Sequence, residues 1–239
     1  MSVSLSALQS RAIVLDVEGT TTPIEFVYTV LFPYARAHAA AYLRREPHSD
    51  ALQPALDRLQ AEQRDDFARG LQPPAPLVDY IGWLMDQDRK SPGLKALQGL
   101  VWREGFESGE LHGQVYPDVP LAFERWRARG LEIYIYSSGS VLAQQLLFGS
   151  ADGGDLTRYL NGYFDTGVGA KTSAASYRAI AAAVHAEASA LLFVSDVVAE
   201  LDAAREAGWQ TVLCVRESER DAPATNRYSI VRSFDEITD

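Results

Sequence analysis

Short apolar runs alternate with helical patterns over the second half of the chain, and one such run also stands near its start. The runs are rich in β-branched or aromatic residues, which is typical of buried strands. They span residues 12–17, 131–136, 191–194 and 211–215, and a final short strand is expected near residues 228–231. Helical spacing between the later runs predicts helices over residues 119–129, 173–185 and 197–207. Strands that alternate with helices predict an α/β fold with a parallel sheet and helices on both of its faces.

Residues 22–113 break this alternation, because they contain no convincing strand pattern. Apolar residues recur there at helical intervals, which predicts a group of helices. The helical stretches run over residues 26–43, 52–59, 77–85 and 94–106. The sequence therefore predicts an α/β core formed by residues 1–21 and 114–239, with an all-helical subdomain, residues 22–113, inserted after the first strand.

The composition is that of an ordinary folded protein, with 47% hydrophobic and 23% charged residues. Acidic residues outnumber basic ones by 32 to 22, and the net charge of −10 disfavours binding to nucleic acid or to an anionic membrane. The start of the chain does not resemble a signal peptide and no run is long enough to cross a bilayer, so we expect a cytoplasmic protein. Nothing marks a coiled coil, and a monomer is expected. The single cysteine, Cys214, excludes an intramolecular disulfide and is expected to be buried.

Polar residues follow the predicted strands at the points where a parallel sheet binds its ligand, beyond the carboxyl ends of the strands. They are Asp16 and Glu18 after the first run, Ser137 and Ser138 after the second, Asp196 after the third, and Lys171 ahead of the helix predicted from residue 173.

These residue types match the needs of phosphoryl transfer. Asp16 can attack phosphorus to form an aspartyl-phosphate, which water then hydrolyses. Glu18 can give a proton to the leaving oxygen and take one from the attacking water. Ser137 and nearby backbone amides can bind phosphate oxygens, and Lys171 can offset the negative charge. The interpretation is that of a phosphatase acting on a small phosphorylated molecule.

A hard cation is needed as well, because three carboxylates and a phosphate dianion repel one another. Magnesium prefers oxygen ligands, usually one or two carboxylates with waters and the substrate phosphate. Asp16 and Asp196 are the obvious pair of ligands.

Each of these motifs has an ordinary structural interpretation when it is taken alone. An Asp-X-Glu sequence often caps a helix, Ser-Ser-Gly-Ser is a common turn, and a single lysine near a helix start is usually solvated. Their order, each at the end of a predicted strand or next to the following helix, is what favours a shared function.

The motifs, in this order, resemble those of the haloacid dehalogenase superfamily, in which a helical cap is inserted after the first motif. Glu18 stands where most of its phosphatases have Asp. The full motifs are similar to those of the enolase-phosphatase (acireductone synthase) family of methionine salvage. They are Asp-Val-Glu-Gly-Thr-Thr-Thr at 16–22, Tyr-Ser-Ser-Gly-Ser at 136–140, Gly-Ala-Lys-Thr at 169–172 and Ser-Asp-Val-Val-Ala-Glu at 195–200.

This resemblance implies the substrate 2,3-diketo-5-methylthiopentyl 1-phosphate, which is first enolised and then hydrolysed to acireductone and phosphate. It also implies that Mg²⁺ is held by Asp16, Glu18 and Asp196, and that substrate is bound by Ser137, Ser138 and Lys171. Whether Glu18 meets the metal through its side chain or its carbonyl, or serves mainly as acid and base, is left open at this point, as is the base for enolisation. Glu200, one helical turn after Asp196, is a candidate supporting residue.

Other functions fit parts of the pattern. A less specific phosphomonoesterase or a phosphomutase uses the same scaffold, since substrate choice depends on the cap and loops. A dehalogenase keeps the nucleophile but needs neither Glu18 nor a metal. A non-catalytic phospholigand-binding protein is expected to have lost Asp16 or Asp196, so the intact acidic set argues against that class.

Overall fold

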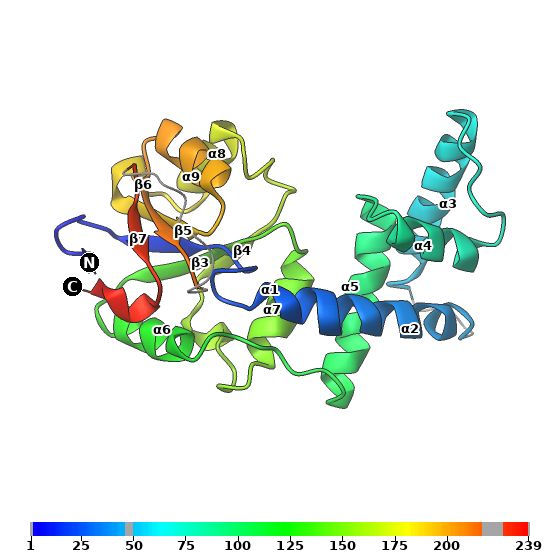
Figure 1. Ribbon diagram of the computed structural model, residues 1–239, viewed down its shortest axis with the longest axis horizontal. Helices are drawn as coiled ribbons and strands as arrows, with labels where there is room; N and C mark the ends of the chain where they lie inside the picture. The colour runs from blue at the N-terminus through cyan, green and yellow to red at the C-terminus, as the bar shows by residue number, and fades with distance from the viewer. Residues whose placement is uncertain (1, 46–49, 217–226, 239) are drawn as a thin grey trace. The chain divides into compact units, whose positions relative to one another are not determined.

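The computed structural model describes residues 2–45, 50–216 and 227–238, and in this part of the chain six parallel strands form the main sheet (Figure 1). Their order across the sheet is β4-β3-β2-β5-β6-β7. The strands are β2 (Ala12–Leu15), β3 (Glu132–Tyr136), β4 (Gly162–Phe164), β5 (Leu191–Ser195), β6 (Gln210–Cys214) and β7 (Ser229–Val231). Leu15 at the end of β2 pairs with Ile135 of β3 and with Val194 of β5. The residues that follow these three strands therefore emerge side by side, as the predicted α/β fold requires.

The main sheet differs from the sequence prediction chiefly at β4 and at the end of β2. β4 was not predicted, because three half-buried residues at the sheet edge give too short a pattern. The first strand ends at Leu15 rather than at residue 17, because the amides of Thr20, Thr21 and Thr22 all donate hydrogen bonds to the carbonyl oxygen of Val17 and close a tight loop there. A separate two-stranded parallel sheet pairs β1 (Val3–Ser4) with β8 (Ile237–Thr238).

Helices cover both faces of the main sheet, as predicted (Figure 1). The helices α8 (Ala174–Ala183) and α9 (Val198–Glu206) lie on one side, and α6 (Asp118–Ala128) and α7 (Val141–Gly149) lie on the other. Single 3₁₀ turns are η2 (Thr157–Tyr159), η3 (Ala188–Ala190) and η4 (Phe234–Glu236). Tyr177 of α8 and Leu201 of α9 share one apolar cluster with Val14 of β2. Burial of these side chains drives the helices onto the sheet. Cys214 is fully buried, and this burial raises the pKa of its thiol to about 12, so its expected place in the core is confirmed.

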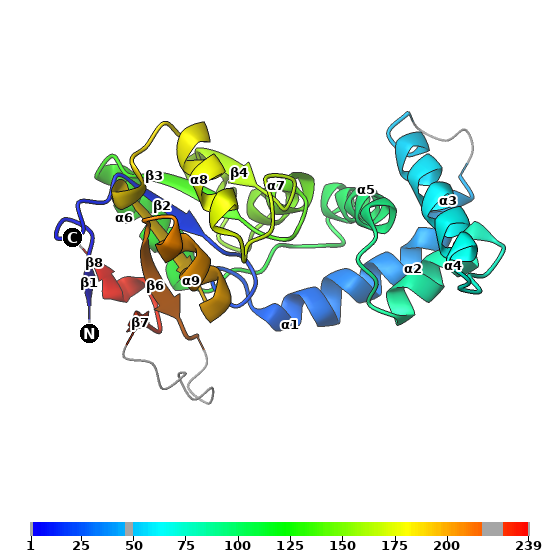
Figure 2. The same cartoon turned by 90° about the horizontal axis from the view of Figure 1, so that it is seen from above.

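A second compact unit, Glu25–Leu111, is all-helical and has an apolar core of its own (Figure 2). Its elements are α1 (Ile24–Phe26), η1 (Val27–Leu31, a π-helical turn), α2 (Phe32–Leu43), α3 (Gln53–Ala68), α4 (Leu77–Asp86) and α5 (Pro92–Ser108). The four predicted helical stretches correspond to α2 to α5. Ser91 caps α5 by accepting a hydrogen bond from the amide of Leu94 at 2.9 Å, and Gly109 ends it in the left-handed conformation. No helix of the described residues is long and apolar enough to cross a membrane.

A buried carboxylate stabilises this helical unit. Asp66 of α3 is 2% exposed, and it accepts hydrogen bonds from the hydroxyl of Tyr80 at 2.9 Å and from Nη2 of Arg89 at 2.8 Å. Burial by itself raises the pKa of Asp66, but the hydrogen bonds from Arg89 and Tyr80 outweigh it and hold the pKa below its ordinary value. The folded state therefore favours the ionised form of Asp66.

We expect Asp66→Ala to lower the free energy of unfolding by about 2–4 kcal/mol, because it leaves the buried hydroxyl of Tyr80 and the charge of Arg89 without their acceptor. Urea unfolding of the full chain, followed by circular dichroism at pH 7, measures this. Asp65→Ala is the matched control, since Asp65 is the exposed neighbour on the same helix. The part of the loss that comes from ionisation should disappear in acid, because a depressed pKa stabilises the fold above the unfolded value of about 3.9 and this stabilisation is lost as the pH falls through the folded pKa. Equal loss in both variants would contradict the assignment.

Candidate active site

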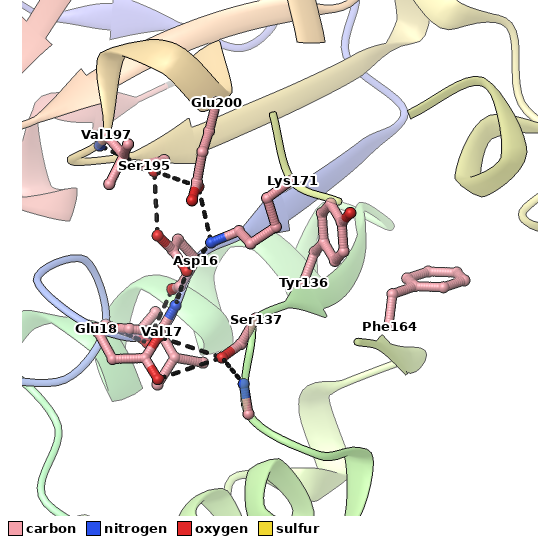
Figure 3. A network of polar contacts seen from close by, with 12 residues as sticks. Asp16, Val17, Glu18, Tyr136, Ser137, Phe164, Lys171, Ser195, Val197 and Glu200 are labelled. Atoms are coloured by element: carbon pink, nitrogen blue, oxygen red, sulfur yellow. Dashed lines mark hydrogen bonds and ion pairs between the residues drawn. The ribbon is translucent and has the colours of Figure 1, made fainter. Parts of the chain in front are cut away.

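The carboxylate of Asp16 lies at the end of β2 and is held by three donors (Figure 3). Its Oδ1 atom accepts hydrogen bonds from the amide of Val17 at 2.8 Å and from Nζ of Lys171 at 2.5 Å. Its Oδ2 atom accepts one from the hydroxyl of Ser195 at 3.1 Å. These three hydrogen bonds and an exposed fraction of 2% restrict the orientation of the side chain. A carboxylate held in this way is suited to act as an oriented nucleophile.

Lys171 comes just before α8, and its side chain is 8% exposed. Its ammonium group lies 2.5 Å from Oδ1 of Asp16 and 2.7 Å from Oε2 of Glu200. The ring of Tyr136 lies 5.8 Å from Nζ and adds a cation–π contact. Burial disfavours the charged form, but the two carboxylates outweigh this cost and raise the pKa of Lys171 above its ordinary value. Lys171 is therefore a fixed positive charge beside Asp16.

Glu200 of α9 is the second acceptor of the lysine, and it is 9% exposed. Burial and the negative charge of Asp16 raise the pKa of Glu200 to about 7, although Lys171 and Ser195 act in the opposite direction. The hydroxyl of Ser195 lies 3.0 Å from Oε2 of Glu200, and it accepts a hydrogen bond from the amide of Val197 at 3.1 Å. A hydroxyl has one proton, so Ser195 donates to either Asp16 or Glu200 at a given moment.

Ser195 was not predicted to have a role of its own. In the sequence, Ser195 is marked only by its position directly after a buried strand and before Asp196. This position does not predict that its hydroxyl donates to Asp16. The candidate role of Glu200 beside the site agrees with its contacts to Lys171 and Ser195.

Glu18 and Ser137 meet on the other side of Asp16. The hydroxyl of Ser137 donates to Oε2 of Glu18 at 3.2 Å and accepts from the amide of Gly139 at 3.0 Å. Burial, followed by the charge of Asp16, raises the pKa of Glu18 above its ordinary value. Ser138 lies next to Ser137 on the same turn, with its side chain exposed.

Asp196 follows β5, and its carboxylate packs against the loop that follows Asp16. A Cβ atom at Gly19 would lie 2.4 Å from Oδ2 of Asp196, and Gly19 also has a φ angle of +72°. Both observations require glycine at this position. The loop can thus approach Asp196 closely.

The carboxylates of Asp16, Glu18 and Asp196 do not form a three-ligand cluster in this structure. Within residues 2–45, 50–216 and 227–238, no group of three or more His, Cys, Asp or Glu side chains has the arrangement of a metal site. The carboxylate of Glu18 is directed at Ser137 instead.

The strand-end aspartate, its buried lysine and the serine turn define the class of protein. The family model for haloacid dehalogenase-like hydrolases matches residues 10–208, and the chain belongs to this family. Within it, the chain belongs to the enolase-phosphatase E1 group: it is 47% identical over 227 residues to enolase-phosphatase E1 of Enterobacter sp. (strain 638), and the match covers 95% of this chain and 96% of that protein. The family and the fold class expected from the sequence are confirmed.

Solved structures share the fold of this chain. The crystal structure of the UTR4 protein from Saccharomyces cerevisiae is similar with a TM-score of 0.77 and 36% identity, over 95% of this chain and 99% of that one. The HAD-hydrolase YfnB from Bacillus subtilis, solved bound to magnesium, is similar with a TM-score of 0.56 and 13% identity, over 95% of this chain and 96% of that one. This second likeness concerns the fold alone.

Proposed function

We propose that this chain is a bifunctional enolase-phosphatase of methionine salvage, which converts 2,3-diketo-5-methylthiopentyl 1-phosphate to acireductone and phosphate. The observation that carries the proposal is the oriented carboxylate of Asp16 beside the buried charge of Lys171, in a chain of the enolase-phosphatase E1 family. The diketone is enolised by transfer of a proton from the carbon next to a carbonyl, and the enol phosphate is then hydrolysed.

Phosphate transfer is proposed to occur in two steps. Asp16 attacks phosphorus, an aspartyl-phosphate forms, and the bond from phosphorus to the leaving oxygen breaks while Glu18 donates a proton to that oxygen. Water then attacks the aspartyl-phosphate and gives its proton to Glu18, which releases phosphate and restores Asp16. The raised pKa of Glu18 supports this role as acid and base.

Substrate binding is assigned to Ser137, Ser138 and Lys171. Ser137 and Ser138 lie on the turn between β3 and α7, where hydroxyl and amide groups can bind phosphate oxygens. Lys171 neutralises charge on the nucleophile and on the phosphate together. In the structure the hydroxyl of Ser137 donates to Glu18, and it can rotate toward a phosphate oxygen when substrate is bound.

The donor set fits magnesium. Two carboxylates with waters and phosphate oxygens are sufficient for this ion, and Asp196 packs against the loop that carries Asp16. We assign the carboxylates of Asp16 and Asp196, and the backbone carbonyl of Glu18, as ligands; the side chain of Glu18 is then free for proton transfer. When it is bound, the ion supplies positive charge that offsets the phosphate and polarises substrate oxygens.

The helical segment, residues 22–113, is proposed to be the cap that selects the substrate. The compact unit Glu25–Leu111, with its own apolar core, supports this assignment. We further propose that the enzyme acts as a cytoplasmic monomer on a small phosphorylated molecule and not on nucleic acid or at a membrane, which is consistent with its net charge of −10.

The test is phosphate release from the diketone substrate with Mg²⁺ and after treatment with a chelator, while the enol intermediate is followed by its ultraviolet absorbance. We expect release that requires Mg²⁺ and is preceded by a transient enol signal. Release without the enol signal, or release from phosphorylated sugars and nucleotides only, would mean that the protein is a phosphatase without enolase activity.

Glu18→Gln tests the proton transfers separately from the attack by Asp16. With 4-nitrophenyl phosphate the leaving group needs no proton, so we expect one burst of 4-nitrophenol equal to the amount of enzyme. Steady turnover should then be slower by about 10²–10⁴-fold, because no base activates the water. Stopped-flow absorbance measures the burst, and Glu187→Gln, at an exposed position, is the control. Slow release without a burst would show that Glu18 is needed for the attack itself.

A further inference from the structure

Arg216, two residues after β6, has a buried guanidinium group outside the set of catalytic residues. Its side chain is 5% exposed, and Nη1 lies 2.5 Å from Oδ2 of Asp118 at the start of α6. The ring of Tyr116 lies 4.4 Å from the guanidinium carbon, and the ring of Phe234 lies 4.3 Å from it. An ion pair and two aromatic rings thus fix the plane of the guanidinium group.

The remaining contact of this group reaches the nucleophile loop, which we define as residues 16–22. Nε of Arg216 donates a hydrogen bond of 2.8 Å to the carbonyl oxygen of Thr20. Thr20 is fully buried, and its amide donates to the carbonyl of Val17, one residue after Asp16. A shift of Thr20 is therefore transmitted to Asp16 through a very short and tightly bonded stretch of chain.

The threonine side chains of the loop provide little anchoring of their own, unlike those of Asp16 and Glu18, which accept hydrogen bonds from Lys171, Ser195 and Ser137. The hydroxyl groups of Thr20 and Thr22 are buried without a hydrogen-bond partner in the described part of the chain. The hydroxyl of Thr21 bonds only within the loop, to the carbonyl of Asp16 at 3.1 Å and of Val17 at 3.2 Å. The threonine part of the loop is instead joined to the surrounding core by two backbone carbonyls: that of Thr20 accepts from Arg216, and that of Thr21 accepts from the amide of Tyr116 at 2.9 Å. Tyr116 is also one of the two rings that hold Arg216.

We infer that Arg216 is a positioning residue, which holds the nucleophile loop, and with it Asp16 and Glu18, in the geometry needed for attack on phosphorus. The inference rests on the proposed function. A group that is misplaced by about 1 Å can lose about 10²-fold in rate, so the anchoring of this loop should affect kcat more than KM.

A role of Arg216 in stability alone would depend on Nη1, which bonds to Asp118, and not on Nε, which bonds to Thr20. Asp118 accepts hydrogen bonds from the hydroxyl of Ser233 at 2.9 Å and from the amide of Phe234, so the pair of Arg216 with Asp118 connects β6 to the C-terminal segment. That connection does not need the bond from Nε to Thr20. Variants can therefore separate the two roles.

The test compares Arg216→Lys and Arg216→Met with Asp118→Asn. Lysine keeps a positive charge near Asp118 but has no donor at the Nε position, and methionine keeps the apolar stem between the two rings. In Asp118→Asn the amide oxygen can still accept from Nη1, and the donor to Thr20 remains. The measurements are kcat and KM for the diketone substrate, Tm, and hydrogen exchange of the peptide that contains residues 16–22.

We expect both Arg216 variants to lower kcat by about 10- to 100-fold, with KM changed by less than about threefold, and to exchange the loop amides faster. Asp118→Asn should lower Tm but keep kcat within about threefold of the parent. If kcat falls equally in Asp118→Asn, or only in proportion to Tm across all three variants, the positioning role is wrong. Should one Arg216 variant fail to fold, the other decides between these outcomes.

If the proposed function is wrong, the parent enzyme itself releases no phosphate from the diketone substrate. The three variants are then compared with the parent on 4-nitrophenyl phosphate instead. Arg216 is assigned to the loop of Asp16 and not to the substrate, so the same pattern of kcat values is expected with either phosphate ester.

Discussion

Asp16→Asn is expected to abolish phosphate release, with kcat lowered by about 10⁴-fold or more. The amide is a far weaker nucleophile than the carboxylate and cannot form the aspartyl-phosphate. The substitution is nearly isosteric, so the fold should survive, although Lys171 loses one of its two carboxylate partners. Phosphate release at saturating substrate and Mg²⁺, together with Tm, measures the effect.

Asp152→Asn is the matched control, because Asp152 is exposed in the same unit of the chain and should keep parental activity. Intact-protein mass spectrometry after rapid quenching adds a second measurement. The parent should carry one phosphoryl group during turnover and the Asp16→Asn variant none. If the variant keeps more than a small fraction of the activity, or becomes phosphorylated, a residue other than Asp16 is the nucleophile.

Lys171→Ala is expected to weaken substrate binding and turnover together, with kcat/KM lowered by about 10²–10³-fold. The ammonium group interacts with phosphate charge in both the ground state and the transition state, so its loss affects KM as well as kcat. The variant also leaves Asp16 and Glu200 buried without their shared cation, so we expect a lower Tm and a protonated Glu200. Lys90→Ala, at an exposed position in the helical unit, is the control.

The double variant Lys171→Ala with Glu200→Gln separates stability from catalysis. Replacement of Glu200 by glutamine should restore part of the lost Tm, because an amide is neutral beside Asp16 without the free-energy cost of taking up a proton at pH 7. The value of kcat/KM should stay low, because the positive charge is still absent. Recovery of activity together with Tm would mean that Lys171 acts through stability and not through the phosphate.

Much of the architecture was predictable because local patterns determine it. Four apolar runs were identified as strands, and helical spacing located α2 to α5 as well as three helices of the α/β core. β4 was missed because three half-buried edge residues carry almost no periodic signal. The end of β2 was placed two residues late, since the hydrogen bonds that three threonine amides make to Val17 cannot be recognised from apolar residues.

The sequence by itself determined which residue types stand at the strand ends, and this was sufficient to indicate phosphate chemistry, with Asp16, Glu18, Ser137 and Lys171 as its candidates. The tertiary structure alone decided how these groups meet. Lys171 lies 155 residues from Asp16 in sequence, and Arg216 lies 196 residues from Thr20. Hydropathy patterns report on burial and on neighbours within a few positions, whereas a hydrogen bond depends on the direction of two side chains that the whole fold brings together. The partners of Lys171, the bond from Ser195 to Asp16 and the anchoring of the nucleophile loop by Arg216 could therefore be found only in three dimensions.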